Sequence, residues 1–266
     1  MTTQRNKYLH ITDCHTKTID RHKLLAAINS QEPKSVFLTG DMSEGFAYLS
    51  DLEYLGQNLK CPMYAVLGNH EIHGSSFAKV HDGIRLLTAQ YKNLIWMDDA
   101  GIVELNKQTC LIGNTNWFDF RIGNENYFNY TLDWALIEDF RKLPTMKDRL
   151  QAMRDFADDC NKAICYRLKE AIENYKSIYL LCHIPPWREC NAAKGWFNQV
   201  FLEPYNTSYA LGQKIEKIMC KHKKRHLTVL AGHCHAACTA EISRNITCHV
   251  GKGSYSKIGE KEIIFI

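Results

Sequence analysis

The sequence predicts an α/β protein built around a mainly parallel sheet. Apolar runs near the N-terminus alternate with segments of helical spacing, and each run stops at polar residues. These polar residues are Asp, Asn and His, which are side-chain types that bind divalent metals. Because parallel strands end at the same edge of a sheet, both observations predict one functional edge at the strand C-terminal ends.

The first half of the chain carries the alternation. Strands are expected at residues 7–12, 35–38 and 63–67. A helix should begin near Asp20, a good N-cap residue, and end near Pro33. A second helix is expected over residues 47–59, where leucines recur at helical spacing.

The second half begins with short strands and then returns to the helix and strand pattern. Strands are expected at 94–97, 102–105 and 110–113, two of which could form a hairpin. An aromatic loop at 116–121 precedes one long amphipathic helix over about 150–175. A strand at 178–182, a helix at 208–220, a strand at 227–231 and closing strands within 240–250 and 262–266 complete the chain.

Five polar clusters follow the expected strands and could form a metal site. They are Asp13-Cys14-His15, Gly40-Asp41, Gly68-Asn69-His70-Glu71, His183 and Gly232-His233-Cys234-His235. Each cluster alone is weak evidence, but together they offer enough oxygen and imidazole ligands for two divalent cations. The neighbouring cysteines are expected to point into the core, because successive side chains alternate along an extended segment.

The order and spacing of these clusters resemble the calcineurin-like metallophosphoesterase superfamily over residues 13–235. The resemblance implies a four-layer α/β/β/α sandwich of mixed sheets flanked by helices, with the active site at the strand C-terminal ends. It also implies one domain over residues 1–266, and we place a helical and aromatic insertion at about 114–176.

The resemblance further implies a role for each polar residue. Asp13, His15 and His235 would hold one ion, Asn69, His183 and His233 would hold the other, and Asp41 would bridge the two. A hydroxide between the ions would attack phosphorus, while His70 would act on the leaving oxygen with Glu71 as its orienting partner. The mixed ligands suit Mn, which we expect first, and also Fe, Zn or Co.

Substrate contacts are expected from two loops that follow strands at the same edge. The candidates are Trp117 and Arg121 in the first loop and Trp187 and Arg188 in the second, with a further loop at 194–197. Aromatic rings and guanidinium groups suit a nucleobase and a phosphate, although the rings near Trp117 could equally belong to the core. We therefore expect hydrolysis of a small, nucleotide-like phosphodiester or phosphomonoester. A nuclease, a protein phosphatase and a non-catalytic interaction module on the same fold remain as alternatives.

The bulk composition excludes several classes of protein. A formal charge of +4 on 266 residues argues against a general nucleic-acid or membrane-surface binder, although the basic run at 221–226 leaves local nucleic-acid contact open. No stretch approaches the roughly 20 apolar residues of a membrane span. Eleven cysteines spread through expected strands and helices fit reduced thiols, so we expect a cytoplasmic protein; its oligomeric state does not follow from the sequence.

Overall fold

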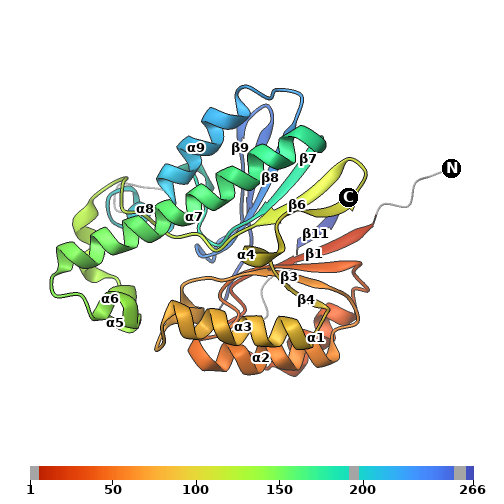
Figure 1. The fold of residues 1–266 in the computed structure, drawn as a ribbon, viewed down its shortest axis with the longest axis horizontal. Helices are drawn as coiled ribbons and strands as arrows, with labels where there is room; N and C mark the ends of the chain where they lie inside the picture. Colours follow the sequence, from red (N-terminus) through yellow and green to blue (C-terminus); the bar gives the residue numbers. More distant parts are fainter. Residues whose placement is uncertain (1–5, 192–197, 255–261) are drawn as a thin grey trace.

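Two mixed β-sheets packed face to face form the centre of the molecule (Figure 1). The computed structural model describes residues 6–191, 198–254 and 262–266. The first sheet has the strand order β11-β1-β2-β3-β4, and the second has the order β5-β6-β7-β8-β10-β9. Neighbouring strands are parallel along β1-β2-β3-β4 in the first sheet and along β6-β7-β8-β10 in the second. This confirms the mainly parallel sheet expected from alternating strands and helices.

The strands are short and lie close to the expected positions. Those of the first sheet are β1 (Lys7–Ile11), β2 (Ser35–Thr39), β3 (Met63–Val66), β4 (Leu94–Trp96) and β11 (Glu262–Phe265). Those of the second sheet are β5 (Val103–Asn106), β6 (Thr109–Gly113), β7 (Ser177–Leu181), β8 (His226–Ala231), β9 (Cys238–Ser243) and β10 (Ile246–Val250). β5 and β6 form the expected hairpin, and β11 closes the first sheet beside β1.

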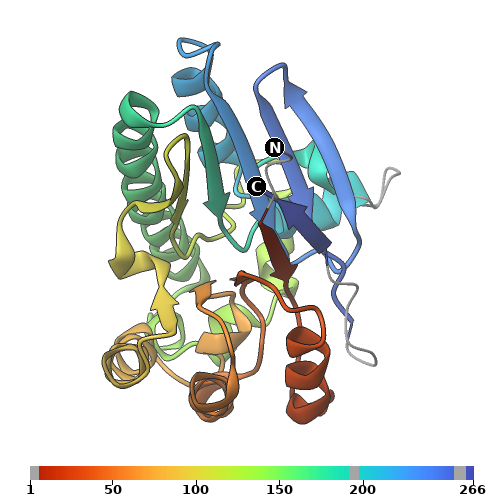
Figure 2. The same cartoon turned by 90° about the vertical axis from the view of Figure 1, so that its right-hand side faces the viewer.

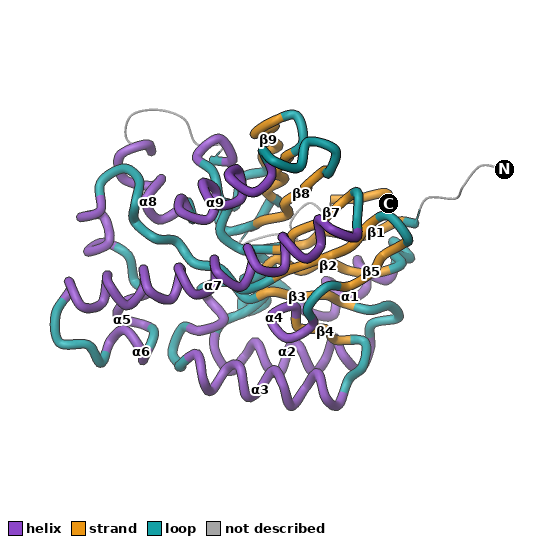
Figure 3. Tube along the Cα trace, turned by 45° about the horizontal axis from the view of Figure 1, so that its top comes forward, coloured by secondary structure: helices purple, strands orange, loops and turns teal. Residues whose placement is uncertain are grey.

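Helices cover the outer face of each sheet, so the fold has four layers (Figures 2 and 3). The first sheet carries α1 (Arg21–Asn29), α2 (Gly45–Asn58) and α3 (Phe77–Gln90), and the second carries α7 (Met146–Asn174) and α9 (Tyr209–Met219). The short helices are η1 (His70–Ile72), α4 (Met97–Ala100), η2 (Glu125–Tyr130), α5 (Asp133–Leu136), α6 (Glu138–Arg141), η3 (Arg188–Cys190), η4 (Asn198–Leu202) and α8 (Glu203–Asn206). The four-layer arrangement confirms the expected fold class.

The central strands, such as β2 and β6, are largely apolar because both of their faces are buried. In β2, Val36 and Leu38 pack toward the helices of the first sheet, while Phe37 faces the second sheet. Phe37 meets Leu181 and Leu230, which come from β7 and β8, in the core between the sheets. This double burial explains why the sequence shows continuous apolar runs rather than strict alternation.

The first long helix, α1, begins as its local chemistry predicts. The Asp20 side chain accepts a hydrogen bond from the His22 amide at 2.8 Å, which caps the start of α1.

The second half of α7 packs on the second sheet through Ile164 and Leu168, while Met153 in its first half packs with the aromatic core. In the described part of the chain, no helix has the length and hydropathy to cross a bilayer.

Candidate metal centre

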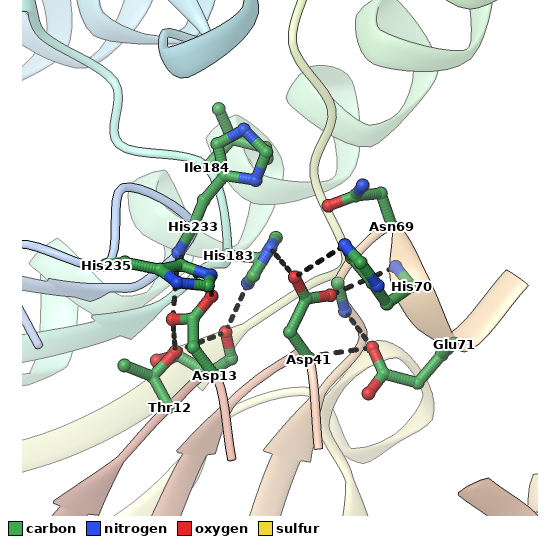
Figure 4. Close-up of polar contacts among 12 residues, drawn as sticks. Thr12, Asp13, Asp41, Asn69, His70, Glu71, His183, Ile184, His233 and His235 are labelled. Carbon is green, nitrogen blue, oxygen red and sulfur yellow. Dashed lines mark hydrogen bonds and ion pairs between the residues drawn. The ribbon is translucent and has the colours of Figure 1, made fainter. Parts of the chain in front are cut away.

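The polar clusters predicted from the sequence come together where the two sheets meet at their strand ends. Asp13 and His15 follow β1, Asp41 follows β2, and Asn69 and His70 follow β3 in the first sheet. His183 follows β7, and the pair His233 and His235 follows β8 in the second sheet. Figure 4 shows the side chains of Asp13 and His235, and those of Asp41, His70 and His183, directed toward one another.

An unusual backbone conformation aims several of these side chains inward. Seven non-glycine residues in the described part of the chain have positive φ, and five of them belong to the candidate site: Asp13, His15, Asp41, His233 and His235. Such a conformation costs about 1–3 kcal/mol per residue and persists only where the surroundings enforce it. Its concentration here is typical of a functional site.

The candidate ligands fall into two groups that share one carboxylate. Ligand atoms of Asp13, His15, Asp41 and His235 all lie within 4.8 Å of one another, and so do those of Asp41, His183 and His233. Asp41 is therefore the carboxylate that both groups have in common, and it is the residue that the family resemblance implies as a bridging ligand.

The first group brings nitrogen and oxygen atoms together with little room between them. The Nε2 atoms of His15 and His235 are 3.1 Å apart, and His235 Nε2 is 3.3 Å from Asp13 Oδ1. Asp13 is held in place because Thr12 Oγ1 donates to its Oδ2 at 2.7 Å and the His233 amide donates to both of its oxygens. The backbone of the second sheet therefore orients a carboxylate of the first.

The second group is oriented by hydrogen bonds on the far side of each ligand. Nδ1 of His183 lies 2.7 Å from the Thr39 carbonyl, so this nitrogen donates and leaves Nε2 facing Asp41 Oδ2 at 3.3 Å. The amide nitrogen of Asn69 donates to Asp133 Oδ1 at 2.9 Å and to the Tyr205 hydroxyl at 3.1 Å. The oxygen of Asn69 is thereby turned toward the site.

The electrostatics of the site favour positive charge between the sheets. Burial raises the pKa of Asp41, but the imidazole of His183 outweighs it and holds that pKa well below its ordinary value. Burial lowers the pKa of His15 to about 4 and of His233 to about 3, so both rings are neutral at physiological pH. Although burial opposes protonation of His183, the Asp41 carboxylate raises its pKa to about 10. Ionised carboxylates and neutral imidazoles are the forms that bind metal ions, so His183 would lose its proton when an ion binds.

The residues present fit a pair of divalent cations. The Asn69 Oδ1 and His233 Nε2 atoms are buried and have no hydrogen-bond partner among the described residues. A buried acceptor without a partner is costly, and a cation would satisfy both atoms. The mixture of carboxylate, amide and imidazole ligands suits a first-row transition metal but does not select one.

His70 lies beside the two groups rather than within them. Its Nε2 is 3.9 Å from Asp41 Oδ2, and its Nδ1 is 3.6 Å from Glu44 Oε1. The other oxygen of Glu44 accepts from Lys17 Nζ at 2.8 Å. The carboxylate that flanks the His70 ring is therefore Glu44.

Glu71 has a structural role in place of the expected role as orienting partner of His70. Its Oε1 accepts from the amides of Met42 and Ser43, and its Oε2 accepts from those of Asp41 and Gly68, at distances from 2.6 to 3.3 Å. The buried carboxylate thus ties the loop after β2 to the loop after β3. It positions the backbone that carries Asp41.

A cavity of about 540 Å³ opens next to His70. It is lined by Glu44, His70, His73, Gly74, Tyr127, Tyr130, Thr131, Leu132, Asp133, Leu136 and Tyr205. In the wall of this cavity, Asp133 Oδ1 lies 3.0 Å from His73 Nε2. The same oxygen accepts a hydrogen bond from the candidate ligand Asn69, so Asp133 connects the cavity to the ligand groups. This volume suits a small-molecule substrate.

The four substrate contacts expected from the sequence lie elsewhere. Trp117 is fully buried against Phe77, and Trp187 is buried with its ring nitrogen donating to Glu216 at 2.8 Å. Arg121 makes a two-point ion pair with Asp158, and Arg188 pairs with Glu203 at 2.9 Å. None of the four lines the cavity beside His70. The segment 194–197 lies outside the described residues.

The sequence analysis missed several residues around the cavity. Glu44 follows the Gly40-Asp41 cluster by three residues and His73 follows the cluster ending at Glu71 by two, and that proximity is a usable signal. Asp133 and Tyr205 carry no such signal, because they reach Asn69 from segments 64 and 136 residues away along the chain. Only the folded chain brings them together.

Comparisons with known proteins agree with this geometry. A family model described as calcineurin-like phosphoesterase matches residues 7–237. Among solved structures, the phosphopantetheinyl hydrolase from Mycobacterium tuberculosis has a TM-score of 0.66 at 13% identity, over 95% of this chain and 90% of that one. A dimetal phosphatase from Danio rerio has a TM-score of 0.61 at 10% identity, over 98% of this chain and 92% of that one. No curated protein sequence matches the chain.

Proposed function

Because the chain belongs to the calcineurin-like phosphoesterase family and is a phosphoester hydrolase, we propose that it uses two divalent cations to hydrolyse small, nucleotide-like phosphoesters. The observation that carries this proposal is the division of the candidate ligands into two groups that share Asp41. One group would hold each cation. A pair of divalent cations would bind the phosphoryl oxygens and supply a water-derived nucleophile at neutral pH.

The protein's own residues hold and orient the reactants. Asp41 would contact both cations, while Asp13 and His183 are held in fixed orientations by the Thr12 and Thr39 contacts described above. Asn69 would present its amide oxygen because Asp133 and Tyr205 occupy its amide nitrogen. Outer contacts of this kind reduce the reorganisation needed when substrate binds.

His70 is the residue we assign to the leaving group. It borders both the Asp41 carboxylate and the cavity, so a substrate whose phosphate lies at the ligand groups would place its leaving oxygen near this ring. Glu44 Oε1 lies 3.6 Å from Nδ1, while Nε2 is the ring nitrogen near Asp41 and is the one we assign to donate to that oxygen.

The cavity supports a nucleotide-like leaving group. Tyr127, Tyr130 and Tyr205 line it together with two leucines, which gives it aromatic and apolar walls next to the polar site. A planar base can stack on such rings, while sugar hydroxyls can reach the polar groups of the wall. We therefore assign specificity to these tyrosines in place of Trp117 and Trp187.

A substrate panel tests the proposal. Purified protein would be assayed with Mn, Fe(II), Zn and Co against p-nitrophenyl mono- and diesters, cyclic nucleotides, nucleoside monophosphates, single-stranded DNA, RNA and phosphopeptides. We expect metal-dependent hydrolysis of the small esters and loss of activity in Asp41→Asn. The matched control is Asp82→Asn, whose side chain is 76% exposed on α3. Undiminished activity in Asp41→Asn would overturn the site assignment, and turnover of only polynucleotides or phosphopeptides would overturn the substrate class.

A further inference from the structure

A groove between α7 and α9 carries a concentration of positive charge that the catalytic site does not explain. It has a volume of about 620 Å³ and is lined by residues of α7, of α9 and of the turn after α9. Figure 1 shows these two helices over the second sheet. The lining of the groove consists of Asn161, Lys162, Cys165, Tyr166, Lys169, Lys214, Lys217, Ile218, Lys221 and His222. It shares no lining residue with the cavity beside His70.

The groove is far more basic than the chain as a whole. Five lysines line it and no carboxylate does, so its lining carries five positive charges where the whole chain has a net charge of +4. Lys162 pairs with Asp159 at 2.8 Å and Lys214 with Asp158 at 3.1 Å. The remaining three lysines form no ion pair with the described residues. An anion in the groove would relieve this accumulation of like charge.

The lysines form two facing rows. Lys162 and Lys169 lie two helical turns apart on one face of α7, and Lys214 and Lys221 have the same spacing along α9 and its end. Seven residues of helix span about 10 Å, so each row covers roughly that length. The second row also contains Lys217, about one helical turn after Lys214. The two rows come together where Lys214 of α9 pairs with Asp158 of α7 at 3.1 Å.

A buried amide in the groove lacks the partners that it requires. Asn161 is completely buried in α7, and neither its Nδ2 nor its Oδ1 has a hydrogen-bond partner among the described residues. A buried amide without partners is destabilising, and a mid-helix position for Asn adds to the cost. The amide is therefore an independent indication that the groove receives a polar ligand.

We propose that the α7–α9 groove is a second, non-catalytic binding site for a small polyphosphate, of the nucleoside di- or triphosphate class. Lysine ammonium groups bind phosphates as point charges, and two rows about 10 Å long match a short phosphate chain. Tyr166 and Ile218 offer an aromatic and an apolar surface for the nucleoside. The groove is too short for the extended track that single-stranded nucleic acids use, which spans several nucleotides.

Calorimetric titration of the Mn-loaded protein tests this site, with Mn in excess over the ligand. The probes are inorganic triphosphate, the β,γ-imido analogue of ATP, AMP and a single-stranded 12-nucleotide DNA. We expect both triphosphates to bind with a Kd on the order of 0.1 mM or tighter, and AMP to bind much more weakly. Equal affinity for the two triphosphates would identify the phosphate chain as the recognised group, and tighter binding of the analogue would add the nucleoside.

Two charge-matched variants separate this site from the catalytic site. Lys169→Glu/Lys217→Glu reverses one lysine in each row, and Lys23→Glu/Lys92→Glu makes the same change in net charge at exposed positions outside the groove. We expect the first variant to bind triphosphate roughly tenfold or more weakly and the second to match the wild type. Hydrolysis of p-nitrophenyl esters should be unchanged in both. Equal triphosphate affinity in the two variants would overturn the proposal, as would binding of the DNA alone.

Asn161→Leu tests whether the Asn161 amide contacts the ligand or has only a structural role. The change removes a buried amide without partners, so we expect a higher melting temperature together with weaker triphosphate binding. An unchanged affinity would remove Asn161 from the site.

Discussion

Replacing Glu71 by Gln tests whether a single buried carboxylate holds the catalytic loops together. The substitution keeps the shape of the side chain but exchanges one oxygen for an NH₂ group. Each oxygen of Glu71 accepts hydrogen bonds from two backbone N–H groups, so the NH₂ group of Gln would face two N–H groups that are also donors. With the remaining oxygen on Met42 and Ser43, the amides of Asp41 and Gly68 lose their acceptor.

The size of the effect follows from those two amides. A buried donor left without a partner costs about 1–3 kcal/mol, so the pair costs about 2–6 kcal/mol of the free energy of unfolding. For a chain of 266 residues, 1 kcal/mol shifts the melting temperature by about 2–4 °C, and the lower bound is therefore a drop of about 4 °C. Activity should fall as well, because one of the two amides belongs to Asp41.

Thermal unfolding followed by circular dichroism measures this drop. Burial, together with the Asp41 carboxylate, raises the pKa of Glu71 to about 7. The melting temperatures of the wild type and the variant should therefore be compared at about pH 8, where the Glu71 side chain is ionised. Glu170→Gln, at an exposed position on α7, is the matched control and should stay within about 0.5 kcal/mol of the wild type. A melting temperature for Glu71→Gln within about 1 °C of that control would refute the assigned role.

Three further predictions concern the ligands and their surroundings. Asp133→Ala should raise the Mn concentration needed for activity roughly 10- to 100-fold, because Asn69 loses the acceptor that orients its amide; an unchanged Mn titration would exclude this role. Gly232→Ala should lower the melting temperature and impair activity, because a Cβ at this position would overlap Thr12 Oγ1 and crowd Asp13; a variant as stable and active as the wild type would show that the loop can shift freely. Removal of metal with EDTA should lower the melting temperature of the wild type, and added Mn should restore it, since a ligand that binds only the folded state stabilises it; Asp41→Asn should show little of this response, and an equal response would place the metal elsewhere.

The cluster of candidate ligands could be predicted because its residues obey local rules. Asp13, Asp41, Asn69 and His183 each lie within three residues of the end of an apolar run, and parallel strands bring such positions to one edge of a sheet. The ligand types and their order along the chain were sufficient to predict the family. Strand and helix positions were predictable for the same reason, since double burial and N-capping leave marks in the nearby sequence.

Which residues surround the site could not be predicted from the local sequence. Trp117 follows a strand at the correct edge, yet it packs in the core, because the first half of α7 and the segment before it supply apolar partners such as Phe156. The same contacts leave the tyrosines of η2 and α8 facing the cavity instead. Whether an aromatic ring in a loop lines a pocket or fills a core depends on which distant segment covers it.

The sequence by itself determined the family, the fold class and the residues available as metal ligands, since these follow from residue type and spacing along single strands. Only the tertiary structure decided that Glu71 binds backbone amides, that Glu44 flanks His70, and that Asp133 and Tyr205 orient Asn69. Each of these contacts joins segments that touch only after the two sheets and their connecting loops have packed, and loop packing is set by long-range burial rather than by local pattern.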